Sequence, residues 1–295
     1  MEFNFKKILK RVLQVTGILV AIILIAIFIM MNFVFPDFYK SEQDQIEIIT
    51  ERGQEQPTFG AYKVGEQKIH YTHVGDTSKP LVLFVHGSPG SSDAFLRYLA
   101  DTSLSKVCQM VTVDRPGFGE SSGEGEPSIE RQAAVLKPIV EKYGKNKKVL
   151  LVGHSLGGPV IVRMAMDYEE LLDGLIILAG SIDPELEPNE WFRPALKYPP
   201  AKWFLNRPFM ASNVEIMPLE DELSEMLPLW KNITIPVTVL QGMDDMLVPA
   251  GNADFAKKVL VNSRKLDIQK IEAENHFFIW TQPELVNQAI FTQLK

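Results

Sequence analysis

The motif Gly-x-Ser-x-Gly at residues 153–157 is the strongest chemical signal in the sequence. It follows the apolar run 149–152, which has the length of a buried strand, and it precedes a segment that can form a helix. Glycines two positions on either side of Ser155 let the backbone turn sharply, which exposes the serine hydroxyl above the strand end. Ser155 is therefore the predicted nucleophile for attack on a carbonyl carbon.

A second match to the same motif, centred on Ser121, lacks this context. It lies several residues beyond its strand and leads into Gly-Glu-Gly-Glu-Pro instead of a helix. A serine there would not sit on a strand-to-helix turn. The context of the two motifs selects Ser155.

An acid and a base follow Ser155 along the chain. Asp245 comes just after the predicted strand 236–240, and His276 comes after the predicted edge strand 265–271. We expect His276 to accept the Ser155 proton, and Asp245 to orient the imidazole and stabilise its charged form.

The acid has two rivals. Asp244 directly precedes Asp245, although a surface turn often carries two aspartates for solvation alone. Asp183 follows another predicted strand and is the weaker rival. The role of the acid therefore stays open between Asp245 and Asp244.

An acyl-transfer site also needs donors for the developing oxyanion. The predicted strand 81–85 ends in the tight loop 86–90, where the backbone N–H of Ser88 can point inward. Together with the N–H of Leu156, it would form a two-donor oxyanion hole, each donor lowering the barrier by about 2.7–4 kcal/mol.

The elements that must position these residues alternate between strands and helices. Short apolar runs separated by helical patterns from about residue 58 onward predict one α/β domain with a mostly parallel sheet. The expected strands are 67–74, 81–85, 110–113, 149–152, 175–178, 236–240 and 265–271, and the expected helices are 92–101, 129–143, 156–168, 253–261 and 283–294. Thr281 and Glu284 form a predicted capping box for the last helix.

One stretch interrupts the alternation. Residues 183–230 contain eight of the 19 prolines and three of the four tryptophans. Because this stretch is too long for an ordinary connection, it predicts a small helical lid over one end of the sheet. We expect its aromatic residues to form mainly the core of the lid: Trp191, Phe192, Trp203, Phe204 and Phe209.

The N-terminus has the pattern of a membrane anchor. Residues 12–36 carry no charge, and as a helix they would be about 37 Å long, enough to cross a hydrocarbon core of about 30 Å. Basic residues precede the run and acidic residues follow it, so we expect a retained single-pass anchor with a cytoplasmic N-terminus and an extracytoplasmic domain. The predicted organisation is a basic segment at 1–11, an anchor at 12–35, a linker at 36–57 and one domain at 58–295.

Composition excludes several classes of function. The chain of 295 residues has a net charge of −7, and the part beyond the anchor has 26 basic and 36 acidic residues. This acidity argues against nucleic acid as a partner. The single Cys108 excludes an internal disulfide and a cysteine-rich zinc site, and we interpret it as a small buried hydrophobe. His70 and His73 fall on opposite faces of a strand, so no metal and no cofactor are expected.

Five motifs in order resemble those of the α/β-hydrolase superfamily over residues 58–295. They are His86-Gly-Ser-Pro-Gly90, Asp114-Arg-Pro-Gly-Phe-Gly119, Gly153-His-Ser-Leu-Gly157, Gly242-x-x-Asp245-x-x-Val-Pro249 and Asn275-His276-Phe277. The resemblance implies a serine hydrolase with an eight-stranded, mostly parallel sheet and a lid inserted after the sixth strand. It also implies structural roles for the loop residues His86, His154, Asp114 and Arg115.

The resemblance leaves the subfamily open. The loops at 86–90 and 114–119 are similar to those of epoxide hydrolases, dehalogenases, C–C bond hydrolases and prolyl iminopeptidases, but the first two attack with an aspartate where this chain has Ser155. Iminopeptidases usually have glycine where this chain has Ser88. They also need lid acids to hold a free amine, for which the candidates are Glu185, Glu187, Glu190 and Glu215.

Two functions from different classes follow. The first is a membrane-anchored serine hydrolase that cleaves carboxylic esters or related acyl compounds, with iminopeptidase-like or C–C bond hydrolysis as alternatives on the same triad. The second is a non-catalytic receptor or scaffold that reuses the fold. The presence of every catalytic part favours the first.

Overall fold

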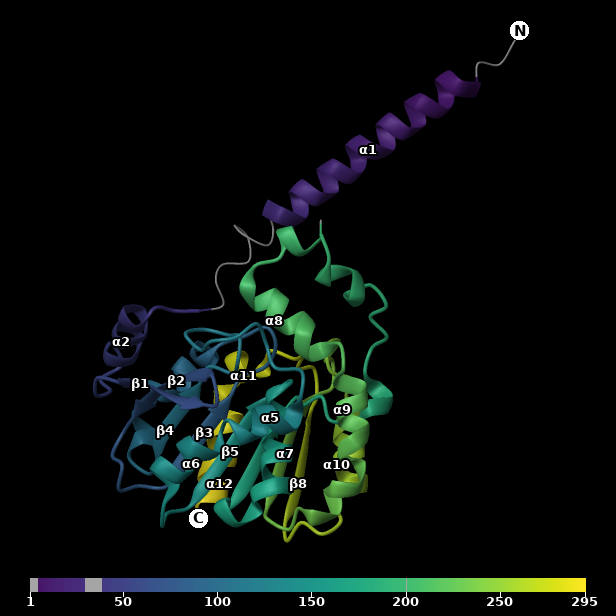
Figure 1. Cartoon of the computed structure of the whole chain (residues 1–295). Helices are drawn as coiled ribbons and strands as arrows, with labels where there is room; N and C mark the ends of the chain where they lie inside the picture. Colours follow the sequence, from purple (N-terminus) through teal and green to yellow (C-terminus); the bar gives the residue numbers. More distant parts are fainter. Residues whose placement is uncertain (1–4, 30–38, 200) are drawn as a thin grey trace.

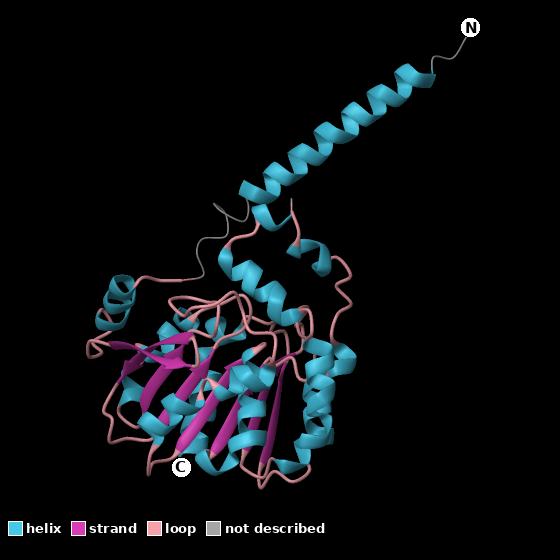
Figure 2. Cartoon of the chain, viewed as in Figure 1, coloured by secondary structure: helices cyan, strands magenta, loops and turns pink. Residues whose placement is uncertain are grey.

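A single eight-stranded sheet forms the centre of the domain (Figure 2). The computed structural model describes residues 5–29, 39–199 and 201–295. The strands are β1 (Thr58–Val64), β2 (Gln67–Val74), β3 (Leu81–Val85), β4 (Gln109–Val113), β5 (Val149–His154), β6 (Gly174–Leu178), β7 (Val237–Gly242) and β8 (Leu266–Ile271). The expected α/β class and eight-stranded sheet are confirmed.

The order of the strands is β1-β2-β4-β3-β5-β6-β7-β8. β2 is antiparallel to both β1 and β4, and every other neighbouring pair is parallel. The central strands β3, β4, β5 and β6 are buried along their whole length. Burial on both faces explains why these strands appear in the sequence as continuous apolar runs instead of alternating ones.

Helices cover both faces of the sheet (Figure 1). One core includes side chains of α5 (Ile129–Ala134), α6 (Lys137–Gly144), α7 (Gly157–Tyr168), α9 (Leu219–Met226) and α10 (Gly251–Val259). The opposite core includes side chains of α2 (Glu42–Thr50), α3 (Leu96–Leu99), α4 (Thr102–Ser105), α11 (Phe278–Thr281) and α12 (Pro283–Leu294). Alternate residues of β3 face the two cores, Leu83 one and Phe84 the other.

Three helix predictions differ from the structure. The expected helix 92–101 is divided into the short helix η2 (Ser92–Phe95) and α3, which ends at Leu99. The expected helix 129–143 is divided into α5 and α6. Pro138, in the first turn of α6, has no N–H with which to continue the hydrogen bonding of α5. The predicted capping box of α12 is wrong, because Gln282 is its N-cap residue and the Thr281 hydroxyl is hydrogen-bonded to Glu274.

The expected lid is a helical insertion between β6 and β7, the position that the resemblance implies. It contains short helices η4 (Pro184–Leu186), η5 (Arg193–Lys197) and η6 (Ala201–Phe204), followed by α8 (Arg207–Ile216), α9 and η7 (Leu227–Asn232). Leu223 and Trp230 belong to the main core, so the second half of the insertion is part of the domain. The first half is different, because Trp191 and Trp203 are 83% and 72% exposed. The prediction that these two tryptophans form a lid core is wrong.

The N-terminal helix α1 (Phe5–Ile29) extends away from the domain (Figure 1). Its stretch Lys7–Ala26 is long and apolar enough to cross a membrane, and none of it is buried against the domain. A single apolar helix near an N-terminus fits an anchor or a signal sequence. The last part of the predicted anchor, residues 30–35, lies outside the described residues.

Helix α2 corrects the prediction that residues 36–57 are a simple linker. Ser41 and Asp44 form a capping box at its start, and Ile49 is completely buried in the core. Gln45 is also fully buried and accepts a hydrogen bond from Thr72 of β2. The polar, acidic sequence concealed this contact, because one buried face of a nine-residue helix needs few apolar residues.

We expect Ile49→Ala to lower the free energy of unfolding by about 2–5 kcal/mol, because it removes a fully buried side chain from the core. Glu47→Ala, at an exposed position of the same helix, is the matched control and should change it by less than about 0.5 kcal/mol. Urea denaturation of the full chain in detergent measures both. Equal stabilities of the two variants would mean that α2 does not contribute to the folded domain.

Candidate active site

Ser155 lies on a tight turn between β5 and α7. Its φ of +54° is in the left-handed region that non-glycine residues rarely adopt. The turn is held because the Ser155 N–H donates to Leu178 O at 2.9 Å and the Gly158 N–H donates to Ser155 O at 2.8 Å. A Cβ on Gly157 would overlap the backbone of Val85 on β3, so the glycine is required by close approach of two chain segments. The structure thus holds Ser155 in the strained conformation that the motif predicts.

Asp245 and His276 are paired at the same edge of the sheet. Asp245 follows β7 and His276 follows β8, and His276 Nδ1 lies 2.8 Å from Asp245 Oδ2. Both residues are buried. This geometry fixes the orientation of the imidazole and leaves Nε2 as the ring nitrogen that is free for proton transfer with a substrate.

The environment of Asp245 keeps its carboxyl ionised. Burial alone would raise its pKa, but hydrogen bonds from His276 and from the N–H groups of Val248 and Leu247 lower the pKa below the usual value. The Gln241 amide adds a further hydrogen bond to Asp245 Oδ2 at 3.2 Å. The sequence analysis did not identify Gln241 as a partner of Asp245. Its position directly after the predicted strand 236–240 was the only sign that it lies near the acid.

The two rivals of Asp245 lie elsewhere. Asp244 is exposed, and its backbone N–H donates to Glu274 O at 2.9 Å. Asp183 caps η4 by accepting a hydrogen bond from the Glu185 N–H. The structure therefore brings Asp245, and neither rival, to His276.

Ser155 and His276 follow the parallel strands β5 and β8 and so lie at the same edge of the sheet. The Ser155 hydroxyl makes no hydrogen bond to His276 among the described residues, and the ring of His154 lies 4.7 Å from the ring of His276. Hydrogen bonds of catalytic groups are often long without substrate and tighten when it binds. The arrangement places a candidate nucleophile after β5 and a candidate base after β8, with β6 and β7 between these two strands in the sheet.

The loop after β3 lies directly against the nucleophile. A Cβ on Gly87 would come within 2.7 Å of Ser155 Cβ, so the backbone of this loop passes beside the hydroxyl. The hydroxyl of Ser88 is buried without a hydrogen-bond partner among the described residues. No backbone hydrogen bond from the Leu156 N–H is seen in this part of the chain either. Neither group therefore has a hydrogen-bond partner among the described residues.

A buried arginine holds this loop in place. All five guanidinium N–H groups of Arg115 are used: Nε donates to His86 O at 2.9 Å, Nη2 donates to Gly87 O at 2.7 Å, and the remaining donors reach Gln132 and Glu215. Arg115 is 1% exposed. It ties loops together near the site, as predicted.

Glu215 is the counter-ion of Arg115 and comes from the insertion. It lies on α8, is fully buried, and receives a hydrogen bond from Arg115 Nη2 at 3.0 Å and one from Gln132 Nε2 at 3.2 Å. The interpretation of Glu215 as an amine-binding lid acid is therefore wrong, because its carboxylate is already engaged. Sequence reasoning missed this role, since nothing in the local pattern links residues 100 positions apart.

His86 and His154 have structural environments. His86 Nε2 accepts from the Arg115 N–H at 3.0 Å and His86 Nδ1 lies 2.7 Å from Gly87 O, an arrangement that fits a neutral ring. Burial and the Arg115 charge lower the pKa of His86 to about 3. Burial and the nearby His276 likewise lower the pKa of His154 to about 3, and its Nε2 lies 3.1 Å from His276 O.

A second histidine–aspartate pair lies away from Ser155. His70 Nδ1 is 2.9 Å from Asp114 Oδ2, and the Glu42 carboxylate of α2 is 3.3 Å from His70 Nε2. Burial alone would raise the pKa of Asp114, but hydrogen bonds from His70 and the Ser92 N–H lower it. This pair joins α2 to the loop after β4 and has an architectural role.

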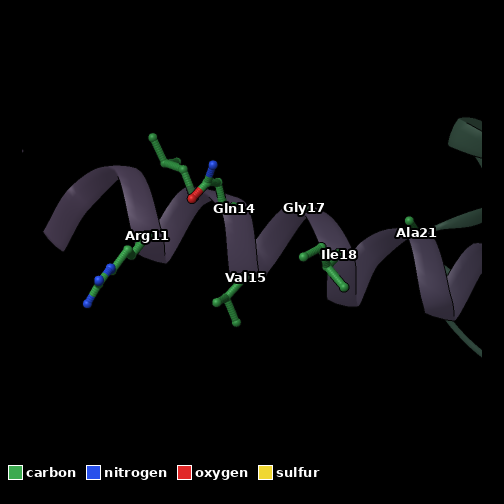
Figure 3. Close-up of a pocket in the computed structure, with 7 residues that line it drawn as sticks. Arg11, Gln14, Val15, Gly17, Ile18 and Ala21 are labelled. Atoms are coloured by element: carbon green, nitrogen blue, oxygen red, sulfur yellow. The ribbon is translucent and has the colours of Figure 1, made fainter. Parts of the chain in front are cut away.

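One surface hollow has no relation to these residues. It runs along the exposed helix α1 (Figure 3) and is lined by Arg11, Leu13, Gln14, Val15, Gly17, Ile18 and Ala21. All of its lining residues belong to this one helix, so the hollow is the space between neighbouring side chains on the helix surface. Within the described ranges, no group of three or more His, Cys, Asp or Glu residues is placed to hold a metal ion.

Comparisons with known proteins support a hydrolase family. A family model for the alpha/beta hydrolase fold matches residues 80–207. The chain is 22% identical over 263 residues to a 2-hydroxy-6-oxononadienedioate/2-hydroxy-6-oxononatrienedioate hydrolase of Pseudomonas sp, covering 77% of this chain and 91% of that protein. It is 24% identical to the lysophosphatidylserine lipase ABHD12 of Xenopus tropicalis, covering 75% of this chain and 59% of that protein.

Solved structures agree on the fold. The crystal structure of a putative lipase from Acinetobacter baumannii AYE superposes with a TM-score of 0.64 at 23% identity, covering 86% of this chain and 96% of that chain. A membrane phospholipase A covers 98% of both chains with a TM-score of 0.61 at 17% identity. The family model, the relatives and the solved structures together support the α/β-hydrolase superfamily and an enzyme of this type.

Glu215→Ala should lower the free energy of unfolding by about 3–5 kcal/mol, because it leaves the buried Arg115 charge without a counter-ion. Glu225→Ala, at an exposed position of the same insertion, is the control and should have an effect below about 0.5 kcal/mol. Chemical denaturation in detergent gives both values. A loss in Glu215→Ala no larger than in the control would mean that the ion pair does not stabilise the domain.

Proposed function

We propose that this protein is a membrane-anchored serine hydrolase that cleaves carboxylic esters through an acyl-enzyme, with Ser155, His276 and Asp245 as its catalytic triad. The observation that carries the proposal is the 2.8 Å contact between His276 Nδ1 and Asp245 Oδ2 at the sheet edge where Ser155 occupies its strained turn. Ester cleavage is the least demanding reaction for this arrangement, since an alcohol is a better leaving group than an amine.

The acylation step uses Ser155 as nucleophile and His276 as base. Ser155 Oγ attacks the ester carbonyl carbon while its proton passes to His276 Nε2, and the ionised Asp245 stabilises the resulting imidazolium. The backbone N–H groups of Leu156 and Ser88 donate to the tetrahedral oxyanion. His276 then gives its proton to the departing alkoxide, which leaves as an alcohol and produces the acyl-enzyme.

Deacylation repeats the sequence with water. His276 removes a proton from a water molecule, whose oxygen attacks the acyl carbon. The second tetrahedral intermediate collapses as the proton returns to Ser155 Oγ, which releases the carboxylic acid and restores the enzyme. The low pKa of Asp245 keeps its negative charge available in both half-reactions.

The alternatives are less well supported. An iminopeptidase-like activity needs an acid of the insertion that points into the site. Glu215 is held by Arg115, Glu190 pairs with Arg193, and Glu187 is hydrogen-bonded to Ser181. The fourth candidate, Glu185, is exposed. C–C bond hydrolysis on the same triad stays a second candidate, favoured by the similarity to the Pseudomonas hydrolase over 91% of its length. A non-catalytic scaffold would not need a strained serine beside an oriented histidine.

The proposed location follows from charge asymmetry around α1. Lys6, Lys7, Lys10 and Arg11 precede the apolar stretch, and Asp37, Glu42 and Asp44 follow it. By the positive-inside rule, the N-terminus lies in the cytoplasm and the hydrolase domain lies on the extracytoplasmic side of the cell membrane.

Ser155→Ala should reduce kcat/KM for 4-nitrophenyl butyrate by at least about 10⁴-fold, because no other nucleophile is aimed at the site. Labelling by a fluorophosphonate probe should disappear as well. The melting temperature should be retained, which separates loss of chemistry from loss of fold. Undiminished turnover in this variant would rule out Ser155 as the nucleophile.

Asp245→Asn should lower kcat by about 10³–10⁴-fold, because an amide cannot stabilise the imidazolium and favours the wrong tautomer of His276. Asp244→Asn is the matched control at the neighbouring position, and its kcat should stay within about twofold of the wild type, since Asp244 is exposed. Steady-state kinetics on a soluble ester distinguish the two. The reverse ranking would make Asp244 the triad acid.

A further inference from the structure

Four aromatic side chains project from the first half of the insertion into solvent. We call them the aromatic surface: Trp191, Phe192, Tyr198 and Trp203, with exposed fractions of 83%, 44%, 67% and 72%. The rings of Trp191 and Phe192 contact each other, and η5 contacts η6, which contains Trp203. Exposed apolar side chains that gather on one segment indicate an interaction site. The fold itself does not use them, since the core-forming tryptophan of the insertion is Trp230.

The segment that carries the aromatic surface is basic in an acidic protein. Residues 191–210 contain Arg193, Lys197, Lys202 and Arg207 and no acidic residue, whereas the whole chain has a net charge of −7. Lys197 and Lys202 are exposed. Tryptophan and tyrosine beside lysine and arginine are the residues that favour the boundary between lipid headgroups and acyl chains.

The chain enters the domain on the side of the insertion. Tyr39 is the first described residue after α1, and its hydroxyl is hydrogen-bonded to Glu120, which contributes, together with burial, to raising the pKa of Tyr39. Arg207, at the start of α8, donates to the backbone carbonyls of Gly119 and Ser121 on either side of Glu120. The entry point and the insertion thus meet at one loop.

The distance from the apolar helix is limited by chain length. Ten steps along the chain separate Ile29 from Tyr39, which reach at most about 35 Å when fully extended. In the structure, the end of α1 contacts η6, the short helix that contains Trp203 (Figure 1). A bilayer crossed by α1 therefore lies beside the aromatic surface, and the other faces of the domain are farther away.

The insertion also lies next to the catalytic residues. It begins just after β6, where the Ser181 N–H donates to Ser155 O at 3.4 Å, and it reaches the oxyanion loop through the pair of Glu215 and Arg115. The first half of the insertion consequently lies between the active site and the end of α1. An amphiphile that leaves the bilayer at this point meets the site without crossing bulk water.

We propose that the aromatic surface inserts into the interface of the bilayer that α1 crosses, and that the substrate is an ester carried by an amphiphilic lipid of that bilayer. This inference rests on the proposed function, because it names the substrate class of the same Ser155 site. The aromatic side chains enter the boundary between headgroups and acyl chains, while Lys197 and Lys202 meet anionic headgroups. The ester bond is then presented at the mouth of the site.

The test compares two esters on full-length protein reconstituted in vesicles of phosphatidylcholine and phosphatidylglycerol. One is 4-nitrophenyl palmitate held in the vesicles, and the other is 4-nitrophenyl butyrate in solution. The double variant W191S/W203S should hydrolyse the vesicle ester at least about tenfold more slowly, and the soluble ester within about twofold of the wild type. Because α1 keeps every variant in the vesicle, the loss reports on the surface alone.

Val261→Ser is the matched control for removal of an exposed apolar side chain. Val261 is 72% exposed and lies before the amino end of β8, whereas Ser155 follows the carboxyl end of the parallel strand β5. Lys257→Glu with Lys258→Glu on α10 is the control for charge reversal in Lys197→Glu with Lys202→Glu. Both controls should leave the two activities unchanged, and the reversal at 197 and 202 should slow only the vesicle ester, most strongly with phosphatidylglycerol present.

Tryptophan fluorescence tests insertion directly. Lipids brominated on the acyl chain should quench part of the wild-type emission, and this part should be absent in W191F/W203F, which keeps the surface aromatic. Absence of quenching, or equal loss of both activities in W191S/W203S, would overturn the inference and leave a protein partner or a second copy as the occupant. Failure of the proposed function has a different signature, in which the wild type neither hydrolyses the soluble ester nor reacts with fluorophosphonate.

Discussion

The buried charge of Arg115 is the constraint on which the rest of the site depends. A guanidinium without access to solvent must satisfy all five of its donors inside the protein. Here the acceptors are the side chains of Gln132 and Glu215 and two backbone carbonyls, those of His86 and Gly87, in the loop after β3. Any displacement of that loop would leave a charge or a donor without its partner. The same requirement fixes α8, so the insertion cannot be repacked without disturbing the backbone beside Ser155.

Two histidine–aspartate pairs in one domain show that the pair alone does not make a catalytic site. His70 and Asp114 have almost the same separation as His276 and Asp245, and hydrogen bonds lower the pKa of both aspartates. The first pair fixes α2 to the sheet, because Glu42 of α2 contacts the ring of His70. The second lies at the carboxyl ends of β7 and β8, where the strained turn after β5 exposes a hydroxyl. The two pairs also differ at the second ring nitrogen, because His70 Nε2 contacts Glu42 whereas His276 Nε2 has no hydrogen-bond partner among the described residues.

The insertion combines two kinds of structure. Its second half, with Leu223 and Trp230, belongs to the same core as β6 and β7, whereas its first half exposes tryptophan, tyrosine and lysine. A polypeptide that buried both halves would have a larger core but no surface toward the end of α1. The proposed membrane contact gives a physical reason for the difference, since a bilayer interface favours side chains that water does not.

The sequence by itself predicted seven of the eight strands, all except β1, and the order along the chain of the candidate catalytic residues. Continuous apolar runs identify buried parallel strands, and the glycines around Ser155 identify its turn, because both signals are local. The pairing of Asp245 instead of Asp244 with His276 is a matter of a single residue in a loop, and only the fold distinguishes them. The counter-ion of Arg115, the burial of Ile49 on α2 and the exposure of Trp191 likewise depend on tertiary contacts. These three features depend on which segments, distant in the sequence, pack against each other in the folded domain. A local pattern of side chains does not contain that information.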